Sequence, residues 1–216
     1  DYSFGFDTAV EIATEAIDRV RTTAESHKRC MVVEVMGRHV GWIALHAGMA
    51  AGAHAILIPE QPQSMDQICE WVQNVASRGR APIVVVAEGF TLNTMETAHS
   101  EKGLDAFNRP RLGGIADMLA PEIEARTGVE SRATVLGHLQ RGGVPSAYDR
   151  VLSTRLGMAA IDSIMRHEWG TMVALRGTEA GFPFELDESG QNRLAQPVPA
   201  GIVGAPILVG DAVEET

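Results

Sequence analysis

The stretch CMVVEVMGRHVG, residues 30–41, indicates the fold class of this chain. It begins with a run of apolar and β-branched side chains that only Glu34 interrupts. The run then ends in a polar segment between two glycines, which is typical of a buried strand that enters a tight turn. We therefore predict a strand over residues 30–36 with polar groups at its carboxyl end.

Helical and strand patterns alternate on both sides of this stretch. Residues 6–25 place apolar side chains at spacings of three and four, with charged side chains between them, which predicts an amphipathic helix. Residues 42–53 predict a largely apolar helix, and residues 55–58 predict a short strand that ends before Pro59.

The next two elements have clear local signals. Ser64 is followed three residues later by Gln67, which fits a capping box and predicts a helix over residues 64–77. The segment PIVVVA, residues 82–87, predicts a strand. Strands and helices that alternate in this order predict right-handed crossovers and an α/β fold with a mostly parallel sheet.

Periodicity fades over residues 90–114, for which we expect a surface excursion. A helix is predicted over residues 115–126, with Gly128 after it, and a strand over residues 131–136.

The stretch RATVLGHLQRGGVPSAYDR, residues 132–150, predicts a strand that ends in a loop rich in glycine, a residue that lets the backbone approach a ligand closely. Pro145 and Ser146 are predicted to restart the chain as a helix, whose pattern is strongest over residues 149–166. A last strand is predicted over residues 171–175. From Gly177 onward, glycine, proline and acidic residues predominate, and the sequence indicates no function for this region.

The composition bounds the class of protein. The chain has 216 residues, of which 45% are hydrophobic, enough for one or two α/β-sized domains. Two cysteines, Cys30 and Cys69, are too few for a disulfide framework and favour a reducing compartment. No apolar stretch approaches the roughly 20 residues of a membrane span, and the first residues lack signal-peptide features. We therefore expect a cytoplasmic protein without membrane association.

The net charge of −10 disfavours nucleic acid as a partner, so an anionic ligand would need a local positive pocket. No dinucleotide or P-loop fingerprint follows a predicted strand. The histidines and cysteines lack the spacing of a zinc site, and we predict no metal ligands. A Ser/His/Asp triad stays open, although nothing in the sequence favours one.

Three predicted strands end in polar motifs, namely MGRHVG, AEG and GHLQRGG. Because the carboxyl ends of parallel strands meet at one edge of a sheet, these motifs are expected to converge. Arg38 and Arg141 could form charge-assisted bonds with a phosphate, His138 could donate another, and Glu88 could accept from a hydroxyl. Each residue alone is more often solvated or salt-bridged, but together they favour a phosphorylated, hydroxyl-rich ligand.

Arg29 directly precedes one predicted strand, and Arg132 lies at the start of another. We therefore expect both at the edge of the sheet opposite to the three polar motifs. Within one chain they are most simply read as surface residues. They could serve the site only if a neighbouring subunit supplied them.

Two long motifs carry a family resemblance. VVEVMGRHVGWIAL, residues 32–45, and ATVLGHLQRGGVPSAYDR, residues 133–150, resemble the bacterial-type 6-phosphofructokinases and occur in the same order. The similarity also covers the first helix, the AEG segment and the helix after Tyr148. The length of residues 90–119 is similar to the actinobacterial or pyrophosphate-related branch.

The resemblance implies a three-layer αβα fold and a fructose 6-phosphate site. Arg38 would bind the sugar phosphate and also stabilise the transferred phosphoryl group, where electrostatics dominate catalysis. Arg29 and Arg132 would come from an adjacent subunit, which implies a homo-oligomer, a dimer or a tetramer. The other ligands within one subunit would be Met36, Gly37, Glu88, His138, Leu139, Gln140 and Arg141.

The resemblance also implies how the chain is divided. Residues 6–140 would form the sugar-phosphate domain, residues 141–195 would return to a nucleotide-binding domain, and residues 196–216 would be a tail. The family's catalytic aspartate and nucleotide site precede the position of Asp1, so we expect a carboxyl-terminal fragment that cannot complete the reaction alone. Mg²⁺ with ATP or pyrophosphate would bind mainly to that upstream part, and the sequence does not distinguish the two donors.

The family's effector site is only partly matched. Arg21 matches an arginine of that site, but His54 stands where a glutamate is expected. The usual lysine cluster is reduced to Arg78, Gly79 and Arg80, which weakens the expectation of allosteric control.

The leading hypothesis is therefore a part of a glycolytic 6-phosphofructokinase. Two alternatives stay open from the sequence. One is a non-catalytic sugar-phosphate-binding or regulatory module. The other is a partner subunit that lends Arg29 and Arg132 to an active homologue.

Overall fold

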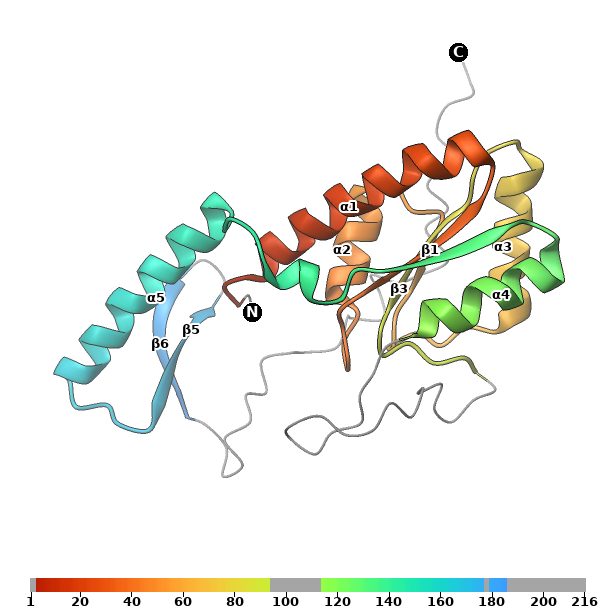
Figure 1. The fold of residues 1–216 in the computed structure, drawn as a ribbon. Coiled ribbons are helices and arrows are strands. Elements are labelled where there is room, and N and C mark those ends of the chain that lie inside the picture. Colours follow the sequence, from red (N-terminus) through yellow and green to blue (C-terminus); the bar gives the residue numbers. More distant parts are fainter. Residues whose placement is uncertain (1–2, 94–113, 177–178, 186–216) are drawn as a thin grey trace, which may run out of the picture.

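A four-stranded parallel sheet forms the centre of the chain in the computed structural model, which describes residues 3–93, 114–176 and 179–185 (Figure 1). Every pairing in this sheet is parallel, as predicted. Strand β1 lies in its interior and is buried at every position, which accounts for its nearly uninterrupted apolar sequence. In spatial order, the strands are β2 (Ala55–Leu57), β3 (Ile83–Ala87), β1 (Cys30–Val35) and β4 (Ser131–Val135).

Helices cover both faces of the sheet, so the expected three-layer αβα arrangement is confirmed (Figure 1). Side chains alternate between the two faces of a strand. On β1, Val33 and Val35 therefore pack with the helices of one face, and Val32 packs with those of the other. The first face carries α1 (Phe6–His27) and α2 (Trp42–Ala50), and the second carries α3 (Met65–Ser77) and α4 (Ile115–Thr127).

The start of α3 follows the predicted cap in part. The hydroxyl of Ser64 accepts a hydrogen bond from the backbone N–H of Gln67 at 3.2 Å, as a capping residue should. The side chain of Gln67 donates instead to Glu70 at 2.9 Å. The cap is thus confirmed, whereas the reciprocal bond of a full capping box is replaced by a contact within the helix.

Helix α2 is shorter than predicted, because it ends at Ala50 and not at residue 53. Gly52 adopts a φ of 62°, a left-handed conformation that stops a helix. The backbone N–H of Ala53 then donates to the carbonyl of Gly48 at 2.7 Å.

The prediction of a loop directly after β4 is wrong, because the segment GHLQR forms a 3₁₀ helix, η1 (Gly137–Arg141). The next helix, α5 (Ala147–Met165), begins directly after Ser146, as predicted. Its start is set by Ser146, whose hydroxyl accepts from the N–H of Asp149 at 3.2 Å.

The region beyond Gly177 contains one further described strand. Strand β5 (Thr171–Arg176) pairs in antiparallel fashion with β6 (Glu179–Glu185), where no element was predicted. Pro183 lies opposite Val173 in this pair. A proline inside a short run hides a strand from sequence patterns, although an edge strand tolerates it.

The group formed by α5, β5 and β6 lies beyond the amino end of α1, away from the four-stranded sheet (Figure 1). Leu152, Leu156 and Leu175 form its small core. The backbone N–H of Thr8 on α1 donates to Asp149 at 2.8 Å and so joins the two parts. Much of the predicted excursion (residues 94–113) and the tail from residue 186 lie outside the described residues. Within the described part, no helix has the length and hydropathy of a membrane span.

Candidate functional site

The three polar motifs lie at one edge of the sheet, as predicted. Val35 at the end of β1 is in register with Ala87 at the end of β3, and Glu34 is in register with Val135 on β4. The segments that follow these strands therefore begin at the same level and lie side by side.

The turn after β1 is held on its β3 side. The backbone N–H of Gly37 donates to the Glu88 carboxylate at 3.4 Å, and the N–H of Gly89 donates to the Gly37 carbonyl at 2.9 Å. A Cβ atom on Gly89 would lie 1.9 Å from the Arg38 carbonyl oxygen. Only glycine therefore allows the two segments to approach so closely.

The same turn is held on its β4 side by η1. The backbone N–H of Met36 donates to the side-chain oxygen of Gln140 at 3.2 Å. Nε of Arg141 lies 3.4 Å from the Met36 sulfur. Gln140 is only 2% exposed, so its amide is part of the packed interior between the two segments.

The side chains that remain accessible at this edge are mainly cationic or hydrogen-bonding. His138 and Arg141 are exposed, and Arg38 and Glu88 are half-buried. Leu139 is 62% exposed and offers an apolar contact or its backbone groups. Two guanidinium groups, an imidazole and a carboxylate at one edge of the sheet can bind a phosphorylated polyol.

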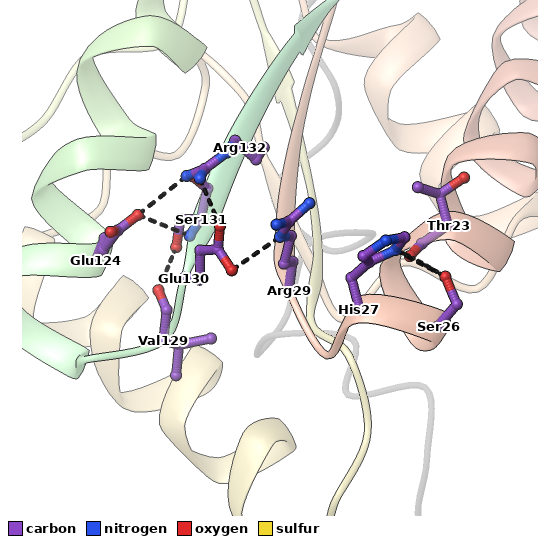
Figure 2. Close-up of polar contacts among 9 residues, drawn as sticks. All are labelled: Thr23, Ser26, His27, Arg29, Glu124, Val129, Glu130, Ser131 and Arg132. Atoms are coloured by element: carbon purple, nitrogen blue, oxygen red, sulfur yellow. Dashed lines mark hydrogen bonds and ion pairs between the residues drawn. The ribbon is translucent and has the colours of Figure 1, made fainter.

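Arg29 precedes β1 and Arg132 lies at the start of β4, so both lie at the opposite edge of the sheet, as expected. At that edge both lie beside Glu130 (Figure 2). Nε of Arg29 forms an ion pair with Glu130 at 2.8 Å. Arg132 also pairs with Glu130, and its Nη1 lies 3.3 Å from Glu124. The contact with Arg29, followed by the charge of Arg132, holds the pKa of Glu130 below its ordinary value. Within this chain the two arginines therefore lie apart from the cluster around Arg38.

Arg21 and His54, the two residues expected at an effector site, both form hydrogen bonds with backbone groups of this chain. Arg21 donates to the carbonyl oxygens of Ala51 and Gly52, the latter at 2.8 Å, and so satisfies the end of α2. Nδ1 of His54 accepts from the N–H of Ile83 at 3.0 Å. Burial, followed by the charges of Arg21 and Arg80, lowers the pKa of His54 to about 4, so its ring is neutral near pH 7.

Glu34 contributes to the construction of this region in a way the sequence did not reveal. Its carboxylate is 2% exposed and accepts from the N–H groups of Gly114 and Ala116, at 3.1 and 3.0 Å. Burial raises the pKa of Glu34, although these two amides lower it in part. The carboxylate thus joins β1 to the first turn of α4, where helix amides need acceptors. A single acid in an apolar strand was the available signal.

Comparison with known proteins identifies the family. The phosphofructokinase family matches residues 1–164. The chain is 61% identical over 179 residues to a pyrophosphate–fructose 6-phosphate 1-phosphotransferase of Amycolatopsis methanolica, covering 83% of this chain and 52% of the relative. It is 53% identical over 182 residues to an ATP-dependent 6-phosphofructokinase of Mycobacterium tuberculosis, covering 84% of this chain and 53% of the relative.

A solved structure of the same family has a similar fold. The phosphofructokinase from Saccharomyces cerevisiae superposes with a TM-score of 0.71 at 36% identity, over 86% of this chain and 23% of that one. The chain spans about half the length of the curated relatives it matches. With the family match, the two motifs and the parallel sheet in agreement, the chain belongs to the phosphofructokinase family.

Proposed function

We propose that this chain is the sugar-phosphate-binding part of a 6-phosphofructokinase, which transfers a phosphoryl group from ATP or pyrophosphate to the 1-hydroxyl of fructose 6-phosphate in glycolysis. The observation that carries the proposal is the convergence of Arg38, Glu88 and Arg141 at one sheet edge. The convergence occurs in a chain whose relatives are named for both donors.

In this proposal, each side chain has a distinct role. Arg141 and His138 bind the phosphate of the sugar, because exposed cationic and N–H groups match its oxygens. Glu88 accepts from a sugar hydroxyl while its other contact, to the N–H of Gly37, fixes the turn. Arg38 stabilises the charge on the transferred group, the task that dominates phosphoryl transfer.

The donor is assigned to no residue of the described part. Among the side chains that the structure describes, those of residues 3–93 and 114–175, no three His, Cys, Asp or Glu residues gather as a metal site. Mg²⁺, which neutralises charge on the donor's oxygens when bound, would therefore be held with the donor mainly by the remaining half of the enzyme.

The proposed division of the chain keeps residues 6–140 as the sugar-phosphate domain, residues 141–195 as a return to the nucleotide-binding domain, and residues 196–216 as a tail. Helix α5 supports it, because its apolar side chains exceed what its small core covers. A face of this kind calls for a covering domain. Its exposed apolar side chains include Val151, Met158, Ile161, Ile164 and Met165.

The proposal includes a cytoplasmic homo-oligomer, a dimer or a tetramer, in which Arg29 and Arg132 bind the substrate of the adjacent subunit. This part of the proposal is supported by the position of Arg29 and Arg132 at the start of their strands, whereas Arg38 follows the end of β1. A side chain at that edge cannot reach its own chain's cluster.

The function is tested on the longer protein with its native upstream sequence. We expect formation of fructose 1,6-bisphosphate with ATP or with pyrophosphate, and a loss of about 100-fold in kcat for Arg38→Ala, as for removal of one charge-stabilising group. Arg19→Ala, which removes an exposed arginine of α1, is the matched control. Absence of turnover with both donors would refute the proposal.

The oligomer is tested with hybrids of two inactive variants. An Arg132→Ala chain mixed with an Arg141→Ala chain should restore activity, because each hybrid interface then contains one site with both arginines intact. If the mixture stays as inactive as either variant alone, the two arginines do not act across an interface.

A further inference from the structure

We infer that Gln140 is a positioning residue, one that replaces the missing end of the β1–β4 ladder and sets the distance between the two arginine-bearing segments. This inference rests on the proposed function and deepens it. It departs from the expectation, implied by the resemblance, that Gln140 contacts the substrate.

The hydrogen-bond pattern of the sheet shows why a side chain is needed here. In the ladder between β1 and β4, the N–H of Cys30 donates to the Glu130 carbonyl at 2.8 Å, and every second residue of β1 repeats this pattern. By this alternation, the N–H of Met36 would donate to the carbonyl of Leu136. That carbonyl instead accepts from the N–H of Leu139 at 3.1 Å, because the chain has turned into η1.

The side chain of Gln140 fills the gap. Its oxygen accepts from the N–H of Met36 at 3.2 Å, and its nitrogen donates to the carbonyl of Gly137 at 3.1 Å. A backbone N–H can only donate and a carbonyl can only accept, so the two partners require one acceptor and one donor on the same side chain. A carboxamide meets this requirement, whereas a carboxylate would set an oxygen against the Gly137 carbonyl.

The burial of Gln140 argues against direct contact between its side chain and the substrate. Only 2% of the residue is exposed, and both ends of its amide are already bonded to backbone groups of the protein. A buried amide that loses a partner costs more than the net value of the bond.

The bonds of Gln140 connect the elements that hold the two proposed ligands. Met36 begins the turn that bears Arg38, and Arg141 follows Gln140 directly and contacts the Met36 sulfur. Glu88 and Gly89 hold the turn on the β3 side, so Gln140 is its counterpart on the β4 side. Loss of Gln140 should therefore displace Arg38 and Arg141 relative to each other and alter both kcat and KM.

The test compares two variants of the longer, active protein. Gln140→Met has nearly the same length and neither donor nor acceptor. Gln140→Glu loses the donor when ionised, but its protonated form has both an acceptor and a donor. Because burial raises the pKa of a carboxyl group, the protonated form should accumulate at mildly acidic pH.

We expect both variants to lose at least about tenfold in kcat/KM near pH 8, with kcat lowered and KM raised, as for a misplaced catalytic group. When the pH is lowered to about 6, the kcat/KM of Gln140→Glu should rise about tenfold or more relative to that of wild type, because the protonated carboxyl group restores both hydrogen bonds. Gln140→Met should show no such recovery. Thermal unfolding of each variant across the same pH range confirms that the compared proteins are folded.

Two results would overturn the inference while leaving the proposed function intact. One is wild-type kcat/KM in Gln140→Met. The other is the same dependence of kcat/KM on pH in Gln140→Glu and Gln140→Met, measured while the wild-type enzyme is active. A wild-type protein without turnover on fructose 6-phosphate would overturn the proposed function and this inference with it.

Discussion

The neutral state of His54 leads to a prediction about acid stability. Nδ1 of His54 accepts the N–H of Ile83, the first residue of β3, and an acceptor must be unprotonated. The pKa of His54 is lowered from 6.5 to about 4. As the pH falls below 6.5, the unfolded chain therefore binds a proton that the folded chain does not. Stability is complete above that pH and is lost as the pH falls toward about 4.

The size of the effect follows from the pKa shift. A shift from 6.5 to about 4 corresponds to about 3 kcal/mol at full strength. His54 is partly exposed, so solvent screening reduces this figure, to roughly half. Between about pH 7 and about pH 5, where most of the change occurs, the folded state should lose about 1 kcal/mol through this one residue.

The assay is urea unfolding of wild type and His54→Gln at both pH values. Glutamine offers an oxygen acceptor to Ile83 and does not titrate, so its free energy of unfolding should fall by about 1 kcal/mol less between the two conditions than that of wild type. His39→Gln, a change of an exposed histidine, should behave as wild type. Equal acid losses in wild type and His54→Gln would refute the assignment of His54 as a neutral acceptor.

Three further outcomes follow from the described contacts. Gly89→Ala places a Cβ 1.9 Å from the Arg38 carbonyl oxygen. It should therefore lower kcat/KM of the longer enzyme by about 100-fold, as for a displacement of about 1 Å. Gly142→Ala, in which the added Cβ lies 3.6 Å from its nearest neighbouring atom, should leave kcat/KM unchanged. Ser64→Ala removes the cap of α3 and should reduce the free energy of unfolding by about 1 kcal/mol in urea titrations, and an unchanged value would contradict the cap. Arg141→Ala should weaken fructose 6-phosphate affinity by about 2 kcal/mol or more, as for loss of a charge-assisted bond, and an unchanged KM would contradict its role.

The sequence predicted the elements whose signals are local. Strands β1 and β3 are buried and apolar, and a short run of β-branched residues bounded by turn residues is typical of such a strand. Helix α3 was bounded by its capping serine, which contacts its own first turn. Convergence of the three polar motifs followed because parallel strands share one carboxyl edge.

Elements that depend on distant partners were missed. Strand β6 exists through its pairing with β5, and nothing within its own sequence marks it as a strand. The conformation of η1 depends on the carbonyl of Leu136, which accepts from the N–H of Leu139 and not from the neighbouring strand. Gln140 and Glu34 serve backbone groups far along the chain, at Met36 and Gly114, and no spacing rule links such residues.

The ion pairs of Arg29 and Arg132 bear on whether these side chains are available to a neighbouring subunit. Both are paired with Glu130 at the chain's surface, where such a pair contributes about 0–1 kcal/mol because water and salt screen it. A charge-assisted hydrogen bond from an arginine to phosphate is worth about 1.5–3 kcal/mol. Exchange of Glu130 for a substrate phosphate is therefore favourable, so the carboxylate can hold both guanidinium groups in place without preventing them from binding substrate in an assembled enzyme.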